Sequence, residues 1–109
     1  MKLIVAVIQD KDSALLLGAL VQHGYRATKL ASTGGFLRAG NTTLLIGVDN
    51  EQVDSVVTLI KEISASRERL VTPMPPVGGT VESYVPYPVE VIVGGATIFV
   101  LDVEHFERV

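Results

Sequence analysis

The chain has 109 residues, of which 48% are hydrophobic and 19% are charged, a composition typical of one compact domain. Its 12 acidic and 9 basic residues leave a formal net charge of −3, which disfavours a general binder of nucleic acid or of an anionic membrane. The sequence contains no cysteine, so a disulfide scaffold, a thiolate zinc site and a cysteine nucleophile are excluded.

The first predicted element is a buried strand over residues 3–8, a continuous apolar run that is partly β-branched. Polar residues end this run too early for an export signal or a membrane span, so we expect a cytoplasmic protein without membrane insertion. Apolar residues at helical spacing predict a first helix over residues 13–23. Asp10 or Asp12 is expected to cap its start, and Gly24 stands where a left-handed cap ends a helix.

Two further strands are expected at residues 26–32 and 42–48, joined by a glycine-rich loop at 33–40. A second helix over residues 53–63 carries an apolar stripe at helical spacing. The four residues 49–52 before it have the spacing of a capping box, which favours a helix start at this point.

The last third of the chain begins with a change in composition. Many prolines and glycines predict a long loop over residues 65–88, either a disordered excursion or a lid that orders on binding. Alternating valines then predict a strand over 89–93, and residues 97–103 predict another. Gly94-Gly95 between them is expected to form a tight hairpin turn, with close approach of the backbone to a ligand as the alternative.

The order strand, helix, strand, strand, helix, strand predicts an α+β subunit with the ferredoxin-like (βαββαβ) fold, in which both helices cover one face of an antiparallel sheet. The other face then needs a cover, because the predicted strands carry apolar residues in both alternating sets. We expect a closed homo-oligomer to provide that cover. No internal repeat or low-complexity tract is visible, so residues 1–109 are expected to form a single domain.

The segment 26–43 is the most informative for function. Its glycines allow backbone amides to turn towards an anion, and its basic side chains add compensating charge, so a phosphate is the natural ligand. The basic residues are Arg26, Lys29 and Arg38.

The tip of this segment carries apolar side chains that a solvent-exposed hairpin does not need. Phe36 and Leu37 are suited to pack on a base or on a neighbouring subunit, and Asn41 is suited to read a base edge. An equally simple interpretation is a plain hairpin whose Phe36 packs on its own sheet. Neither GxxxxGK[ST] nor GxGxxG after a buried strand occurs, so the common nucleotide fingerprints do not apply.

Catalysis finds little support in the sequence. His23 and His105 are the only imidazoles, and neither has the spacing of a catalytic triad or a metal site, so both are predicted to be surface or structural residues. Asp10 and Asp12 could suggest a magnesium site, but such a pair before a helix is usually a cap. The charge cluster at residues 67–69 is expected to remain solvated. We therefore expect no catalytic residue, no metal ion and no cofactor.

Several blocks spread over nearly the whole chain resemble the PII-like cyclic di-AMP receptor family, also called DarA or PstA. The joined blocks RATKL, TGGFL and GNTT are far more specific than a lone glycine motif. The matching blocks are residues 1–4, 9–12, 26–30, 33–37, 40–43 and 93–101. The resemblance implies a homotrimer that binds cyclic di-AMP in each cleft between subunits without turning it over. It also implies that loop rearrangement changes contacts with a downstream protein partner, which the sequence does not identify.

The resemblance also implies roles for individual residues. Arg26 would meet a phosphate or a base, Thr28 would donate to a phosphate, and Asn41 would hydrogen-bond an adenine. The remaining residues would wall in a base, permit close approach of the backbone, or complete the wall from the neighbouring subunit. The implied ligand-binding residues are Arg26, Ala27, Thr28, Gly35, Phe36, Leu37, Asn41, Gly47, Gly94, Gly95 and Phe99.

Two positions depart from the family pattern. Gly24 stands where members usually have asparagine, and Arg108 stands near a position where members usually have an amide or imidazole side chain.

Two other functions fit a similar topology. A PII-like regulator of the ATP or ADP type would use the same clefts, but loop 33–40 is much shorter than in ordinary PII proteins. A CutA-like trimeric metal-binding protein has similar topology, but the absence of cysteine and the scarcity of histidine argue against a soft metal.

Overall fold

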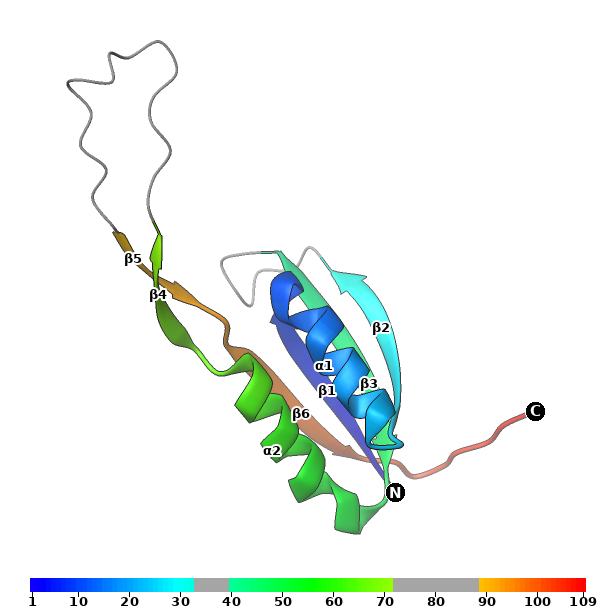
Figure 1. The fold of residues 1–109 in the computed structure, drawn as a ribbon. Coiled ribbons are helices and arrows are strands. Elements are labelled where there is room, and N and C mark those ends of the chain that lie inside the picture. Colours follow the sequence, from blue (N-terminus) through cyan, green and yellow to red (C-terminus); the bar gives the residue numbers. More distant parts are fainter. Residues whose placement is uncertain (33–39, 72–88) are drawn as a thin grey trace, which may run out of the picture.

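The computed structural model describes residues 1–32, 40–71 and 89–109 (Figure 1). Strands β2-β3-β1-β6, in that order, form one four-stranded antiparallel sheet, and β4-β5 form a separate two-stranded ribbon. The elements are β1 (Lys2–Gln9), α1 (Asp10–Gln22), β2 (Arg26–Ser32), β3 (Asn41–Val48), the 3₁₀ turn η1 (Asn50–Gln52), α2 (Val53–Ser64), β4 (Arg67–Val71), β5 (Val89–Val93) and β6 (Ala96–Asp102). Both helices lie on one face of the sheet (Figure 1), so the predicted α+β arrangement, consistent with a ferredoxin-like fold, is confirmed.

The hydrophobic core lies between the sheet and the two helices. Alternate residues of β1 and β3 point into it, because successive side chains of a strand point to opposite faces. The apolar stripes of α1 and α2 supply the facing side, as their helical spacing predicts. The core residues are Ile4, Ala6, Ile8, Leu16, Leu20, Leu44, Ile46, Val48, Val56 and Ile60. In the part of the chain that the structure describes, no helix is long and apolar enough to cross a membrane.

Several local predictions are confirmed at the helix ends. Gly24 has a φ of +82°, and the amide of Tyr25 donates to the carbonyl of Leu20 at 2.9 Å, which closes α1 with a left-handed cap. The amide of Asp49 donates to Oε1 of Gln52 at 3.0 Å in a capping box ahead of α2. His23 and His105 are exposed, as predicted.

The predicted cap of α1 is wrong. The helix starts at Asp10 itself, and no side-chain hydrogen bond caps it. Both carboxylates have partners elsewhere: Asp10 accepts from the hydroxyl of Thr42, and Asp12 forms an ion pair with Nη2 of Arg67 at 2.9 Å. The Arg67 side chain stays 46% exposed, as predicted for this charge cluster, but its ion pair with the buried Asp12 was not predicted. These partners lie 32 and 55 residues away along the chain, beyond the reach of a local pattern.

The predicted hairpin turn at Gly94-Gly95 is also wrong, because β5 pairs with β4 instead of β6. Gly94 and Gly95 carry the chain from the ribbon into the sheet with φ values of +84° and +104°. There Gly94 passes close to the end of α2, and a Cβ on it would come within 2.6 Å of the carbonyl oxygen of Ala65. This close approach is to the chain's own backbone, whereas the alternative predicted from the sequence was close approach to a ligand.

The predicted loop at 65–88 is interrupted by a strand, since Arg67–Val71 form β4. This strand pairs with β5 from Arg67 opposite Val93 to Val71 opposite Val89. Residues 72–88 of that loop and residues 33–39 of the other predicted loop lie outside the described part of the structure.

An ion pair joins the edge strand β6 to β1, at the end of the sheet where β1 begins and β6 ends. Lys2 Nζ contacts Oδ1 of Asp102, and this hydrogen bond, with the positive charge of Lys2, lowers the pKa of the Asp102 carboxyl. A carboxyl whose pKa is lower in the folded chain adds stability above its ordinary pKa and loses it as the pH falls through the lowered value. Because Asp102 is exposed, this contribution is small.

Candidate functional site

The face of the sheet opposite the helices is open and largely apolar. Strand register places its side chains in rows that cross the sheet from β6 to β2. One row is Leu101, Leu3, Gly47 and Arg26, and the next is Phe99, Val5, Leu45 and Thr28. Phe99 and Leu101 are 44% and 49% exposed. The open face is therefore apolar on β6 and β1 and gains polar groups on β2.

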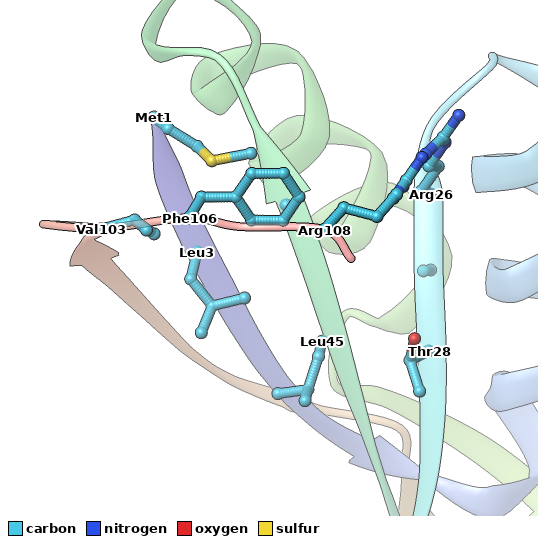
Figure 2. A pocket seen from close by; sticks show the side chains of 10 residues that line it. Met1, Leu3, Arg26, Thr28, Leu45, Val103, Phe106 and Arg108 are labelled. Carbon is cyan, nitrogen blue, oxygen red and sulfur yellow. The ribbon is translucent and has the colours of Figure 1, made fainter.

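A cavity of about 640 Å³ lies at the Gly47 end of this open face (Figure 2). The segment after β6 crosses the end of the sheet to form one wall, and the amide of Val103 donates to the carbonyl of Met1 at 3.2 Å. The lining residues are Met1, Leu3, Arg26, Ala27, Thr28, Leu45, Gly47, Val103, Phe106 and Arg108. Strands β1, β2 and β3 thus form the floor, and the C-terminal segment forms the rim.

The lining of this cavity combines positive charge with apolar surface. Arg26 and Arg108 project towards the same edge in Figure 2, and the ten lining residues include no acid. Within the described residues, neither guanidinium has an ion-pair or hydrogen-bond partner. Two unpaired guanidiniums at one cavity favour an anion, and a planar fork suits a phosphate in particular.

Two further groups complete the chemistry of the cavity. The Thr28 hydroxyl can donate to an anion, and the Phe106 ring offers a flat apolar surface (Figure 2). A Cβ built on Gly47 would meet only the terminal methyl carbon of Met1, at 3.9 Å. The floor at Gly47 is therefore open towards the cavity and leaves room for a ligand.

A second group of the sequence-predicted residues lies at the opposite end of the sheet. Asn41 pairs with Gln9 in the strand register, and the Gly94 amide donates to Oε1 of Gln9 at 2.7 Å. Asn41 is only 2% exposed. It stands six residues before Gly47 on β3, which is roughly 20 Å of extended strand.

The structure thus divides the predicted site residues. Four of them line the cavity: Arg26, Ala27, Thr28 and Gly47. Asn41, Gly94 and Gly95 lie at the other end, while Phe99 stands between the two ends on the open face. Gly35, Phe36 and Leu37 lie outside the described residues. One subunit therefore brings only part of the predicted set together.

The sequence analysis singled out Arg108 through the family resemblance, but it missed five other lining residues. Leu3 and Leu45 could have been found from strand alternation, because they share a face with Arg26 and Thr28. The other three have no local signal, since they reach the cavity only when the chain ends fold over the sheet. They are Met1, Val103 and Phe106. Among the described residues, no group of three or more His, Cys, Asp or Glu could hold a metal ion.

Comparison with known proteins adds two findings. A family model described as "Cyclic-di-AMP receptor" matches residues 1–109, the whole chain. A crystal structure of a functionally unknown protein from Pediococcus pentosaceus ATCC 25745 is similar over 99% of this chain and 96% of the other, with 44% sequence identity and a TM-score of 0.81.

Proposed function

The chain belongs to the cyclic-di-AMP receptor family, and from this premise we propose that it is a non-enzymatic cytoplasmic sensor that binds cyclic di-AMP between the subunits of a homotrimer. Cyclic di-AMP binding and signalling follow from the family. The comparisons do not support an ATP or ADP regulator, nor a CutA-like metal-binding protein. The cavity whose two arginines have no partner among the described residues is the observation that supports this assignment of the site.

The cavity supplies groups for both parts of the ligand. Cyclic di-AMP contains two phosphates and two adenines, so its site needs cationic or amide donors beside apolar surfaces. Arg26 and Thr28 bind a phosphate in this proposal, and the open backbone at Gly47 lets the ligand lie against the sheet. Arg108 adds a second cation to the same cavity. Because arginine only donates hydrogen bonds, it cannot reproduce an acceptor contact of the usual amide side chain.

The distance along β3 supports a site that is completed between subunits. Arg26 and Asn41 of one subunit lie too far apart to hold neighbouring groups of one ligand. In our proposal the Arg26 end of one subunit meets the Asn41 end of the next. Phe36, Leu37 and the wall of Gly94, Gly95 and Phe99 complete the second side.

The open sheet face supports the trimer that this arrangement requires. Apolar side chains such as Phe99 and Leu101 are nearly half exposed in the isolated subunit, and contiguous exposed apolar surface usually marks an interaction site. In the trimer, ligand binding rearranges loop 33–40 and the segment 65–88, which includes β4, and so changes the surface offered to a downstream protein.

The direct test is isothermal titration calorimetry with cyclic di-AMP, with ATP and cyclic di-GMP as controls and the mass measured in solution. We expect cyclic di-AMP to bind at one ligand per subunit of a trimer and both controls to bind much more weakly. A folded trimer that does not bind cyclic di-AMP, or that binds ATP more tightly than cyclic di-AMP, would contradict the proposal.

Mixed trimers test whether each site draws on two subunits. Arg26→Ala and Asn41→Ala should each weaken binding at least about 10-fold when present in all subunits. Refolding the two variants together should restore one intact site in every mixed trimer, where an intact Arg26 faces an intact Asn41. Calorimetry measures the restored fraction, and each variant refolded alone is the control. If both residues served the same site from one subunit, mixing would restore nothing.

A further inference from the structure

The turn from β1 into α1, residues 9–12, contacts two parts of the fold that are far apart in the sequence. We call these residues the β1–α1 turn. On one side it contacts residues 40–42, where β3 begins. On the other side it contacts Arg67 and Gly94, the two residues at the base of the β4–β5 ribbon.

Asp10 forms hydrogen bonds with the residues on both sides of Asn41. Its amide donates to the carbonyl of Gly40 at 2.9 Å, and its carboxylate accepts from the hydroxyl of Thr42. A Cβ at Gly40 would push the same carboxylate aside, so the absence of a side chain there leaves room for Asp10. A shift of the backbone around Asn41 must therefore move Asp10 or break these contacts.

Gln9 and Asp12 hold the base of the ribbon. Oε1 of Gln9 accepts from the Gly94 amide at 2.7 Å, and Oδ1 of Asp12 accepts from Nη2 of Arg67 at 2.9 Å. The same guanidinium donates through Nη1 to the carbonyl of Ala65 at 3.1 Å. Arg67 thus ties the first turn of α1 to the chain that follows α2.

Two buried polar atoms at the base of the ribbon lack hydrogen-bond partners among the described residues. Asp12 is 5% exposed, and its Oδ2 has no hydrogen-bond partner among the described residues. The buried hydroxyl of Ser64, whose carbonyl accepts from the Gly95 amide, lacks a partner within the same residues. Unsatisfied buried polar groups are costly. An arrangement that pairs these groups would recover part of that cost.

We propose that the β1–α1 turn couples Asn41 to the base of the β4–β5 ribbon, so that ligand contacts at Asn41 change the ribbon's attachment. Asp10 and Asp12 are then positioning residues and do not touch the ligand. This inference rests on the proposed function in assigning Asn41 to the ligand site. The mechanical link itself consists of contacts within the chain.

The first test needs no ligand. Amide hydrogen exchange at Gly94 and Gly95 is measured by NMR in the parent protein, in Thr42→Val and in Asp10→Asn. Both variants weaken the contact between Asp10 and Thr42, and we expect exchange at the two amides to become about fivefold to tenfold faster. The control is Asp102→Asn, which breaks the ion pair at the far end of the sheet and should leave these amides unchanged. Unchanged exchange in both folded variants would overturn the coupling.

The second test adds cyclic di-AMP. In the parent, we expect ligand to change exchange at the amide of Val93, which pairs with Arg67 at the base of the ribbon and lies outside the proposed site, by about threefold or more. In Asp12→Asn and in Arg67→Gln this response should be lost, while the affinity measured by calorimetry stays within about threefold of the parent. Binding without any response in the parent would refute the coupling. Absence of binding would instead refute the proposed function, and the ligand-free test would still decide whether the two regions are linked.

Discussion

Replacing Arg26 with alanine is expected to weaken cyclic di-AMP binding by about 10-fold to 150-fold while the subunit remains folded. Hydrogen bonds to a charged group contribute about 1.5 to 3 kcal/mol each, and about 1.4 kcal/mol corresponds to a tenfold change in the dissociation constant. Arg26 is exposed on β2 and takes no part in the core. Its loss should therefore remove a ligand contact without opening a cavity in the core.

Two further variants separate the contribution of charge from that of geometry at this position. Arg26→Lys keeps the positive charge but loses the planar fork, so an intermediate affinity is expected. Lys29→Ala removes a cation from the same strand but from the face opposite Arg26, and it should bind like the parent. Calorimetry with circular dichroism as a check on folding measures all three. Parent-like affinity in Arg26→Ala would remove Arg26 from the site.

Leu101→Glu is expected to convert the proposed trimer into monomers. Leu101 lies on the open face of β6 and is 49% exposed in the isolated subunit, so a glutamate is tolerated there as long as the subunit stands alone. In the trimer the same carboxylate would be buried against apolar surface without a partner, which costs several kcal/mol for each subunit. The folded monomer is then favoured.

Light scattering coupled to size-exclusion chromatography measures this change as a mass one third that of the parent. The matched control is Val21→Glu, which puts the same charge on α1 at a position that is 61% exposed and away from the open face. That variant should remain trimeric. Because each site spans two subunits in our proposal, Leu101→Glu should also lose cyclic di-AMP binding. A trimeric Leu101→Glu protein would show that the interface lies elsewhere.

Local patterns in the sequence determined most of the fold. The apolar run in β1, the helical stripe in α2 and the left-handed cap at Gly24 are properties of residues close together in the chain, and each was predicted and found. The same holds for the capping box before α2. The ligand class followed from the joined blocks in segment 26–43, and the family match agrees with it.

Only the tertiary structure decided which distant groups meet. Strand periodicity does not specify a partner strand, so the pattern of β5 is compatible with pairing to β4 or to β6. In the structure β5 pairs with β4, and Arg67 at the start of β4 forms an ion pair with Asp12. The position of Asp10 before the predicted helix indicates a cap, but that position alone does not determine which group its carboxylate binds. In the structure the carboxylate accepts from the hydroxyl of Thr42. The division of the predicted site between the two ends of β3, and the closing of the cavity by Phe106 and Arg108, arise from strand register and chain crossing. These contacts depend on loop closure over many residues and on the competition between burial and hydrogen bonding, which no local spacing records.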